Sequence, residues 1–88
     1  MKIEYFPLAH TRFTLKEMQI TSMLCDGLLH KQIAEHFKIT SGTVDHRVSQ
    51  LARKAHVKNS KELVALAIAE GMERNGTYRG FYLFGKKD

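Results

Sequence analysis

Apolar residues in the middle of the chain recur at helical spacing and predict four helices. The first begins at a capping box, Thr14-Leu15-Lys16-Glu17, in which the side chains of Thr14 and Glu17 each accept a hydrogen bond from the other residue's backbone N–H. We expect this helix to run to about Asp26, because Gly27 is a natural C-terminal stop.

The second and third predicted helices are separated by only a few residues. Residues 31–37 place apolar side chains on one face, and Thr40 is an N-cap for a helix over residues 41–55. The apolar side of this third helix carries Val44, Val48, Leu51 and Ala55. Its opposite side is polar and should face outward: Gly42, Asp45, His46, Ser49 and Arg53. Two helices joined so tightly must cross at a steep angle, so the first braces the second.

A fourth helix should follow Ser60, its predicted N-cap, and run to about Glu70, just before Gly71. Residues 63–69 are apolar around the whole circumference of this helix. A surface helix of a monomer has no reason for such a pattern. The pattern of the fourth helix is therefore not that of the exposed surface of a monomer.

The two ends of the chain differ from this helical centre. Six of the eight aromatic residues lie there: Tyr5, Phe6, Tyr78, Phe81, Tyr82 and Phe84. Apolar and polar residues alternate in both segments, so we expect residues 2–6 and 78–84 to pair as two short antiparallel strands that lean on the helices. The alternative is a loose tail with exposed aromatic side chains.

These patterns predict an all-α fold, a tetrahelical helix-turn-helix bundle to which the two ends add a small β element. We expect an N-terminal extension over residues 1–12, a helix-turn-helix domain over 13–71 and an aromatic C-terminal extension over 72–88.

The positive charge of the chain is concentrated in the predicted helix-turn-helix. The 88 residues include 14 Lys or Arg and 9 Asp or Glu, which gives a net charge of +5. Between Leu28 and Lys61 there are seven basic and two acidic residues, so the remainder of the chain is neutral. A basic protein favours a polyanionic partner, either nucleic acid or an acidic membrane surface, and this placement favours phosphate binding. The alternative is an ordinary solvated polar face.

Residues for chemistry and for metal binding are not arranged in any familiar pattern. Cys25 lies within a helical pattern, where a free cysteine is usually a small buried apolar residue, and a single cysteine fits a reducing cytoplasm. The five histidines have no metal-ligand spacing: His10, His30, His36, His46 and His56. We therefore expect no enzymatic activity, metal or cofactor. No apolar run is long enough for a membrane span, and residues 1–4 do not begin a signal peptide, so we expect a cytoplasmic protein.

Residues 13–67 resemble the DNA-binding domain of the LuxR (GerE-like) family. The matching residues are Phe13-Thr14, Glu17, Gly27-Leu28, Lys31-Gln32-Ile33-Ala34, Ile39-Thr40, Thr43-Val44, Lys54, Val57 and Glu62-Leu63-Val64-Ala65-Leu66-Ala67. Each piece alone is weak, but the ordered set at this spacing is specific. Full-length members usually carry a separate receiver or ligand-sensing domain, for which 88 residues leave no room, so the chain resembles the stand-alone members.

The resemblance implies a DNA-binding site on the third helix and a dimer contact on the fourth. The positions that usually reach base edges are Asp45, His46 and Ser49. The positions near the phosphate backbone are Lys31, Thr43, Arg47, Arg53 and Lys54. The positions on the fourth helix that fit a homodimer contact are Val64, Ala67, Ile68 and Gly71, whereas Leu63 and Leu66 fit the core.

The chain departs from the family pattern at several positions. Asp45 stands where a basic residue is usual, so the resemblance implies an altered site preference or weaker DNA binding; an acid in the groove can accept from cytosine N4. Leu29 stands where a capping Ser is usual, and a lost cap costs on the order of 1 kcal/mol. Thr21 replaces a core Leu, which should weaken packing or lead to a hydrogen bond back to the helix.

The sequence therefore predicts a regulator of transcription that binds double-stranded DNA with the helix over residues 41–55, as a homodimer on an inverted repeat. The alternative is a protein-binding module that keeps the fold and acts on another regulator. Asp45 and the aromatic C-terminal segment favour this second interpretation.

Overall fold

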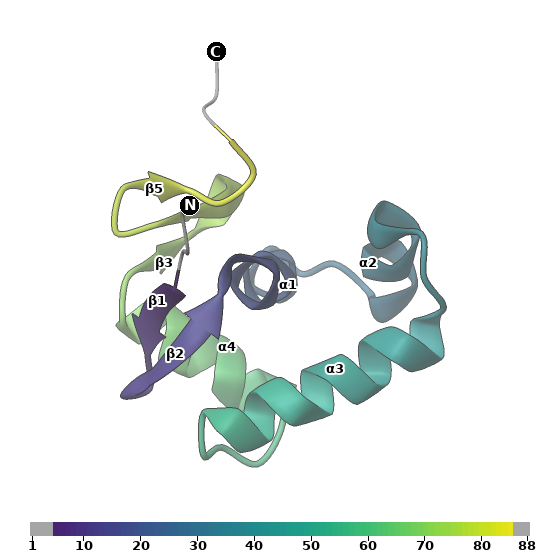
Figure 1. Cartoon of the computed structure of the whole chain (residues 1–88), viewed down its shortest axis with the longest axis horizontal. Coiled ribbons are helices and arrows are strands. Elements are labelled where there is room, and N and C mark those ends of the chain that lie inside the picture. The colour runs from purple at the N-terminus through teal and green to yellow at the C-terminus, as the bar shows by residue number, and fades with distance from the viewer. Residues whose placement is uncertain (1–4, 86–88) are drawn as a thin grey trace.

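The computed structural model describes residues 5–85 and contains the four predicted helices (Figure 1). They are α1 (Leu15–Cys25), α2 (His30–Phe37), α3 (Ser41–Lys54) and α4 (Ser60–Ala69). Each begins and ends close to its predicted range. Within the described part of the chain, none of the helices has the length and apolar character needed to cross a membrane.

The helix ends show why the chain forms helices at these places. Thr14 and Glu17 form the predicted capping box at the start of α1, with N···O distances of 3.2 and 2.8 Å. Thr40 caps α3 as predicted, because its Oγ1 accepts from the N–H of Thr43 at 3.2 Å. The predicted cap of α4 is wrong by one residue: Asn59, not Ser60, accepts from the backbone, and Ser60 is the first residue of the helix.

The hydrophobic core lies where α1, α3 and α4 meet. The whole predicted apolar side of α3 is buried there: Val44, Val48, Leu51 and Ala55. Residues of the two ends are buried in the same core: Phe6, Leu8, Met72, Tyr78 and Leu83. The segments that flank the helices therefore belong to the folded unit rather than forming loose tails.

The N-terminal segment folds back on itself as a hairpin. Strand β1 (Tyr5–Leu8) pairs antiparallel with β2 (Thr11–Thr14), with Phe6 opposite Phe13. The turn consists of Ala9 and His10, both in the left-handed region, with φ of 55° and 60°. Thr14 ends β2 and caps α1, so the hairpin leads directly into the first helix.

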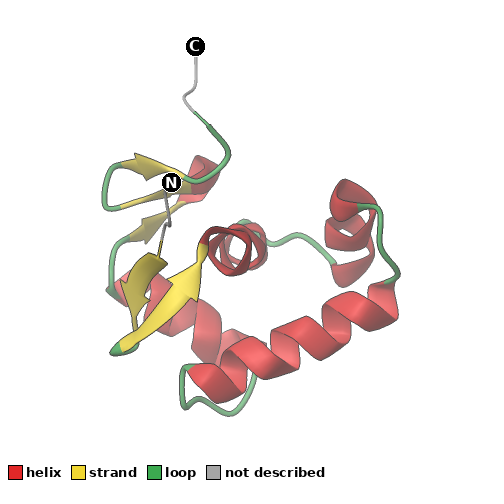
Figure 2. Ribbon diagram, in the orientation of Figure 1, coloured by secondary structure: helices red, strands yellow, loops and turns green. Residues whose placement is uncertain are grey.

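The C-terminal segment forms a second, three-stranded antiparallel sheet. Its strands are β3 (Met72–Glu73), β4 (Thr77–Tyr78) and β5 (Phe81–Tyr82), with a 3-10 turn, η1 (Arg74–Gly76), between the first two. Figure 2 shows the two sheets on the same side of α1, away from α2.

The predicted pairing between residues 2–6 and 78–84 is therefore wrong. Residues 5 and 6 pair with 14 and 13, and residues 2–4 lie outside the described part of the chain. Tight turns fold each end onto its own neighbouring residues, which requires less chain ordering than pairing the two ends. The ends meet through side chains instead: the Phe6 ring contacts the Phe81 ring edge-on at 5.0 Å, and the Tyr78 hydroxyl donates to the carbonyl of Pro7 at 2.5 Å.

Glu70, the residue that follows α4, joins both sheets to the helices. Its Oε2 accepts from the N–H of Ala9 in the first hairpin at 3.0 Å, and its carbonyl accepts from Nε of Arg79 at 2.8 Å. Farther along, the side-chain amide of Gln19 on α1 donates to the carbonyl of Leu83 at 2.7 Å. The terminal segments are thus anchored by polar contacts as well as by their buried apolar side chains.

Candidate nucleic-acid interface

The connection between α2 and α3 is three residues long and is shaped by one left-handed residue. Lys38 has a φ of 58°, and the next N–H, of Ile39, donates back to the carbonyl of Ala34 at 3.0 Å. This geometry ends α2 abruptly and turns the chain into α3. Figure 1 shows α2 standing across the first turns of α3, which is the predicted helix-turn-helix arrangement.

The outward side of α3 is not covered by any part of the described chain. Asp45, His46 and Ser49, which were predicted to reach base edges, are all exposed. Arg53, on the same side one turn later, is exposed as well. The whole length of the helix is therefore available to a partner.

Two clefts border this exposed side. The larger, of about 490 Å³, lies between α3 and the starts of α2 and α4 and is called here the α4-side cleft. Its lining includes His30, Asp45, Ser49, Arg53, Lys58 and Ser60. The smaller, of about 130 Å³, lies between α3 and the start of α1 and is called the α1-side cleft. Its lining consists of Thr14, Lys16, Glu17, Ile20, Arg47, Gln50 and Leu51.

Asp45 is held by a side chain of the neighbouring helix. Its Oδ1 contacts Nδ1 of His30, the first residue of α2, at the edge of the α4-side cleft. The Asp45 side chain is still 64% exposed, so its second oxygen remains free to accept a hydrogen bond. The contact orients the one acid on the exposed side of α3, and a protonated His30 would offset its negative charge.

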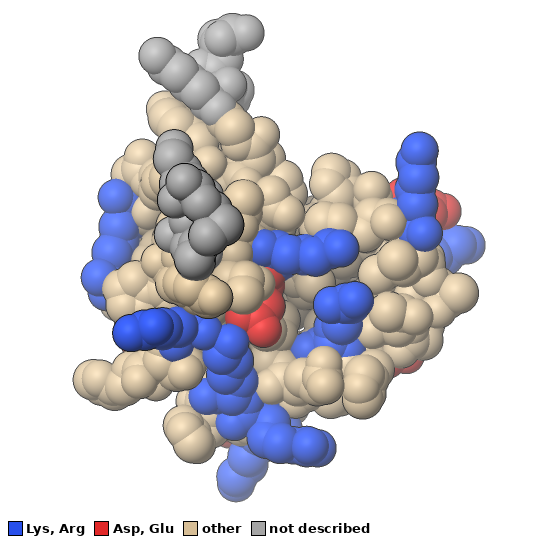
Figure 3. Space-filling view, in the orientation of Figure 1, with Lys and Arg blue, Asp and Glu red and all other residues tan. Residues whose placement is uncertain are grey.

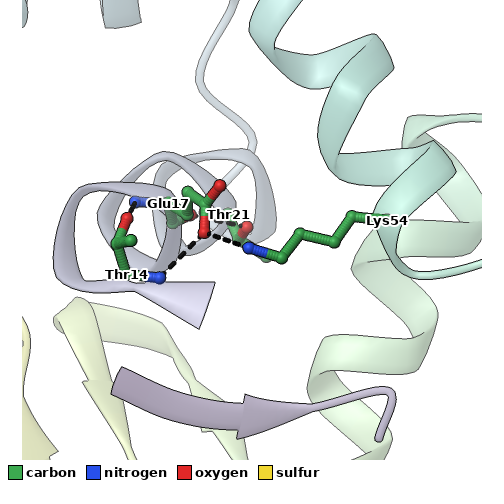
Figure 4. Close-up of polar contacts among 4 residues, drawn as sticks. All are labelled: Thr14, Glu17, Thr21 and Lys54. Atoms are coloured by element: carbon green, nitrogen blue, oxygen red, sulfur yellow. Dashed lines mark hydrogen bonds and ion pairs between the residues drawn. The ribbon is translucent and has the colours of Figure 1, made fainter. Parts of the chain in front are cut away.

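Lys54, a predicted phosphate contact, takes part in an internal ion pair (Figure 4). Its Nζ donates to Oε1 of Glu17 at 2.8 Å and lies 5.0 Å from the centre of the Phe13 ring. The same Glu17 oxygen accepts from the backbone N–H of Thr14. The pair ties the end of α3 to the start of α1, and both side chains are about 30% exposed.

Thr21 supports the same corner of the molecule from inside α1. It is fully buried, and its hydroxyl donates to the carbonyl of Glu17 at 2.8 Å (Figure 4). The predicted hydrogen bond back to the helix is therefore confirmed. At Leu29, where a capping side chain is missing, Oε1 of Gln32 accepts from the free N–H of Leu29 at 2.8 Å and replaces part of the lost cap.

The remaining predicted phosphate contacts lie on three surfaces. Lys31 is exposed on α2, and Arg47 is exposed at the α1-side cleft. The Thr43 hydroxyl is 2.9 Å from that of Thr40, within the cap of α3. Sequence reasoning missed Lys16 and Lys58, one in each cleft; their positions within two residues of the helix caps Thr14 and Asn59 were the available signal.

Comparison with known proteins agrees with this geometry. Residues 11–67 match the bacterial regulatory proteins of the luxR family, a segment that spans β2, the first three helices and most of α4. The chain belongs to the LuxR family. The probable transcriptional regulator ycf29 of Cyanophora paradoxa is 35% identical over 60 residues, which are 68% of this chain and 29% of that protein. The chain therefore spans less than a third of this relative, and no solved structure gives a significant match.

The LuxR-family match ends at residue 67, within α4, where sequence reasoning placed a dimer contact. Ile68 is 53% exposed and Val64 is half-buried, so both can meet a partner. The side chain of Ala67 is fully buried in the core, so it cannot contact a partner. Its predicted place in the interface is therefore corrected. Gly71 is only partly exposed, and a Cβ there would lie 2.7 Å from Cγ of Arg79, so packing within the chain already requires glycine.

Cys25 ends α1 and is partly buried against the core of this LuxR-family domain. Burial, together with the neighbouring carboxylate of Asp26, raises the pKa of its thiol to about 11. The thiol is therefore protonated at neutral pH and is a poor nucleophile.

Proposed function

We propose that the protein is a sequence-specific regulator of transcription that places α3 in the major groove of double-stranded DNA. The observation that carries the proposal is the uncovered outward side of α3, bordered by a cleft on each flank. A single exposed helix fits the major groove, where each base pair presents a distinct set of donors and acceptors. LuxR-family membership supports the same assignment.

Base edges would meet the middle of the exposed side. Asp45 accepts from cytosine N4, while His30 holds the carboxylate in position. His46 and Ser49 offer further donors and acceptors on the same side. Because Asp45 repels phosphate, we expect the protein to be selective rather than tight-binding.

Phosphate groups would meet the cations around the exposed side, because one backbone strand borders each edge of the groove. Arg47 would contact the DNA strand on the α1 side, and Arg53 the strand on the α4 side. Lys31 and Thr43 add contacts from α2 and the first turn of α3. Lys54 acts mainly by holding α3 against α1, since its ammonium is already paired with Glu17.

We further propose that the protein binds as a homodimer through α4. Ile68 and Val64 face outward there, and an apolar groove of about 550 Å³ lies beside Val64. Leu29, which borders this groove, is 67% exposed. Covering these side chains with a second copy would remove them from water and produce a two-fold protein that reads an inverted repeat.

Selection from a random duplex pool at a fixed 100 mM salt tests this proposal. We expect enrichment of an inverted repeat, and an affinity that falls steeply between 50 and 200 mM salt. Sedimentation of the wild type and of Ile68→Asp, at equal concentration, tests the α4 contact. Absence of duplex binding even at 50 mM salt would refute the proposed function.

A second candidate function rests on one observation. Phe81, Tyr82 and Phe84 are 41%, 45% and 43% exposed, an unusual display of aromatic surface for a small domain. These side chains would suit a protein partner of the C-terminal segment, so that the domain acts on another regulator. Failure to bind duplex DNA, combined with a stable protein complex that is lost in Tyr82→Ala, would favour this alternative.

A further inference from the structure

Two exposed cations, one on β2 and one at the start of α1, have been given no contact with DNA so far. Arg12 lies on β2 and Lys16 in the first turn of α1, and both side chains are exposed. Within residues 5–85, neither forms an ion pair. Each lies over an aromatic ring instead: Arg12 is 6.0 Å from the centre of Tyr5, and Lys16 is 5.4 Å from that of Phe37. The rings limit the directions that these two chains take and leave their charges open to solvent.

The single carboxylate in the α1-side cleft is already neutralised. Glu17 accepts from Lys54 Nζ at 2.8 Å and from the N–H of Thr14 at 2.8 Å through the same oxygen. The cleft therefore keeps the positive charges of Lys16 and Arg47 without an equal negative charge. Gln50 contributes a neutral side-chain amide to the same lining. This lining is suited to an anionic oxygen rather than to a cation or an apolar group.

Basic side chains from three elements share one face of the molecule. Figure 3 shows Lys and Arg side chains gathered on the face formed by the hairpin, the start of α1 and α3. Arg12 and Lys16 extend this surface from Arg47, on the edge of α3, over the hairpin. Unpaired charges from separate elements on one face suit contacts with several phosphates of one DNA strand.

We propose that the β1–β2 hairpin and the start of α1 form a second phosphate-backbone contact, with Arg12 and Lys16 as its cations. This inference rests on the proposed function, because it needs α3 in the major groove. The strand that borders the groove on the α1 side then passes over the α1-side cleft and continues along β2. Arg12 and Lys16 add affinity without sequence information, because phosphates are the same at every base pair.

Salt-dependent binding to a fixed duplex tests the inference with variants that remove charge and keep the side-chain stem. Arg12→Gln and Lys16→Gln should each lower the magnitude of the negative slope of log K against log salt by about 0.9, and the double variant should lower it by about 1.8. Arg74→Gln is the matched control, because Arg74 is an exposed arginine in η1, beyond α4, and should leave the slope unchanged. The order of preference among duplex sites should be the same in the four variants as in the wild type.

The outcomes separate this inference from the function on which it rests. A wild-type slope in the double variant, together with a reduced slope in Arg47→Gln, would overturn the hairpin contact and leave α3 as the DNA-binding element. A changed order of site preference in Arg12→Gln or Lys16→Gln would also overturn it, since phosphate contacts carry no sequence information. Absence of duplex binding by the wild type would remove the proposed function and the inference together. Thermal melts of the variants distinguish a lost DNA contact from a loss of folding. We expect melting temperatures near that of the wild type, because neither side chain is buried.

Discussion

On the α2–α3 side of the molecule, Lys31, Arg47 and Arg53 reach solvent, and within residues 5–85 none of them forms an ion pair. Around Glu70, where α4 meets the C-terminal sheet, the polar groups are satisfied within the chain: Glu70 accepts from the N–H of Ala9 and from the guanidinium of Arg79. Charges left without internal partners contribute little to folding and remain available to a ligand. The comparison indicates that the helix-turn-helix side is suited to binding and the Glu70 side to rigidity.

The largest expected effect concerns the rigid side. Leu83→Ala should lower the free energy of unfolding by about 2–5 kcal/mol, because a side chain only 1% exposed would leave a cavity. Urea unfolding measures the loss, and Tyr82→Ala, at a 45% exposed neighbouring position, is the control with a much smaller expected effect. At a temperature where both variants are folded, DNA affinity should match the wild type. A comparable drop in affinity would show that the two sides do not act separately.

A second prediction sharpens the description of the binding side. Asp45→Asn removes the one acid from the exposed side of α3 and keeps the shape of the side chain. Affinity for duplex DNA in general should rise, and the order of preferred sites should change by about 1–3 kcal/mol at the base pair concerned. Site selection with the variant and the wild type at equal salt measures both effects. An unchanged order of sites would show that Asp45 makes no base contact.

A third prediction concerns a phosphate contact on the same side. Arg47→Ala should weaken binding about equally for every duplex sequence. It should also lower the magnitude of the slope of log K against log salt by about 0.9. Its thermal stability should stay near that of the wild type, because the side chain is exposed. Fluorescence anisotropy on two unrelated duplexes gives the comparison. A loss confined to one sequence would instead identify Arg47 as a base contact.

The smallest expected effect is a loss of stability in alkali. Burial raises the pKa of the Cys25 thiol from 9.0 to about 11 and raises that of the Tyr78 hydroxyl above 10.0. Because the folded state holds both protons more tightly, this stability is complete below pH 9 and is lost as pH rises through 9–11 and above. Melting temperatures at pH 8, 9.5 and 10.5 should fall by a few degrees in total. Cys25→Ser should flatten the first part of the decline, and a decline as steep as that of the wild type would contradict the assignment.

The four helices could be predicted because their signals are local. The capping box at Thr14 and Glu17, the cap at Thr40 and the apolar side of α3 each lie within a few neighbouring residues. The exposed side of α3 followed from the same periodicity. Local hydrogen bonds and side-chain spacing determine these features, so no knowledge of distant contacts was needed.

The errors arose where structure depends on distant or unusual contacts. Ala9 and His10 form a left-handed turn without glycine or asparagine, so the first hairpin carried no turn signal, whereas Asn75-Gly76 was a turn signal in the C-terminal sheet that the sequence analysis did not use. On α4, which is apolar all around, periodicity could not distinguish buried Ala67 from exposed Ile68. The ion pair between Glu17 and Lys54 joins residues 37 positions apart, so no local sequence pattern predicts it.

The placement of the two sheets has a consequence for how the domain can be joined to other proteins. Strand β1 and strand β5 lie on the side of α1 away from α2, and α3 runs along a different edge of the molecule (Figure 1). A fusion partner, fluorescent tag or neighbouring domain joined after β5 would therefore be attached on the side away from α2 and α3. The C-terminal side is the better place for a tag, because the hairpin at the N-terminal side carries the proposed phosphate contact.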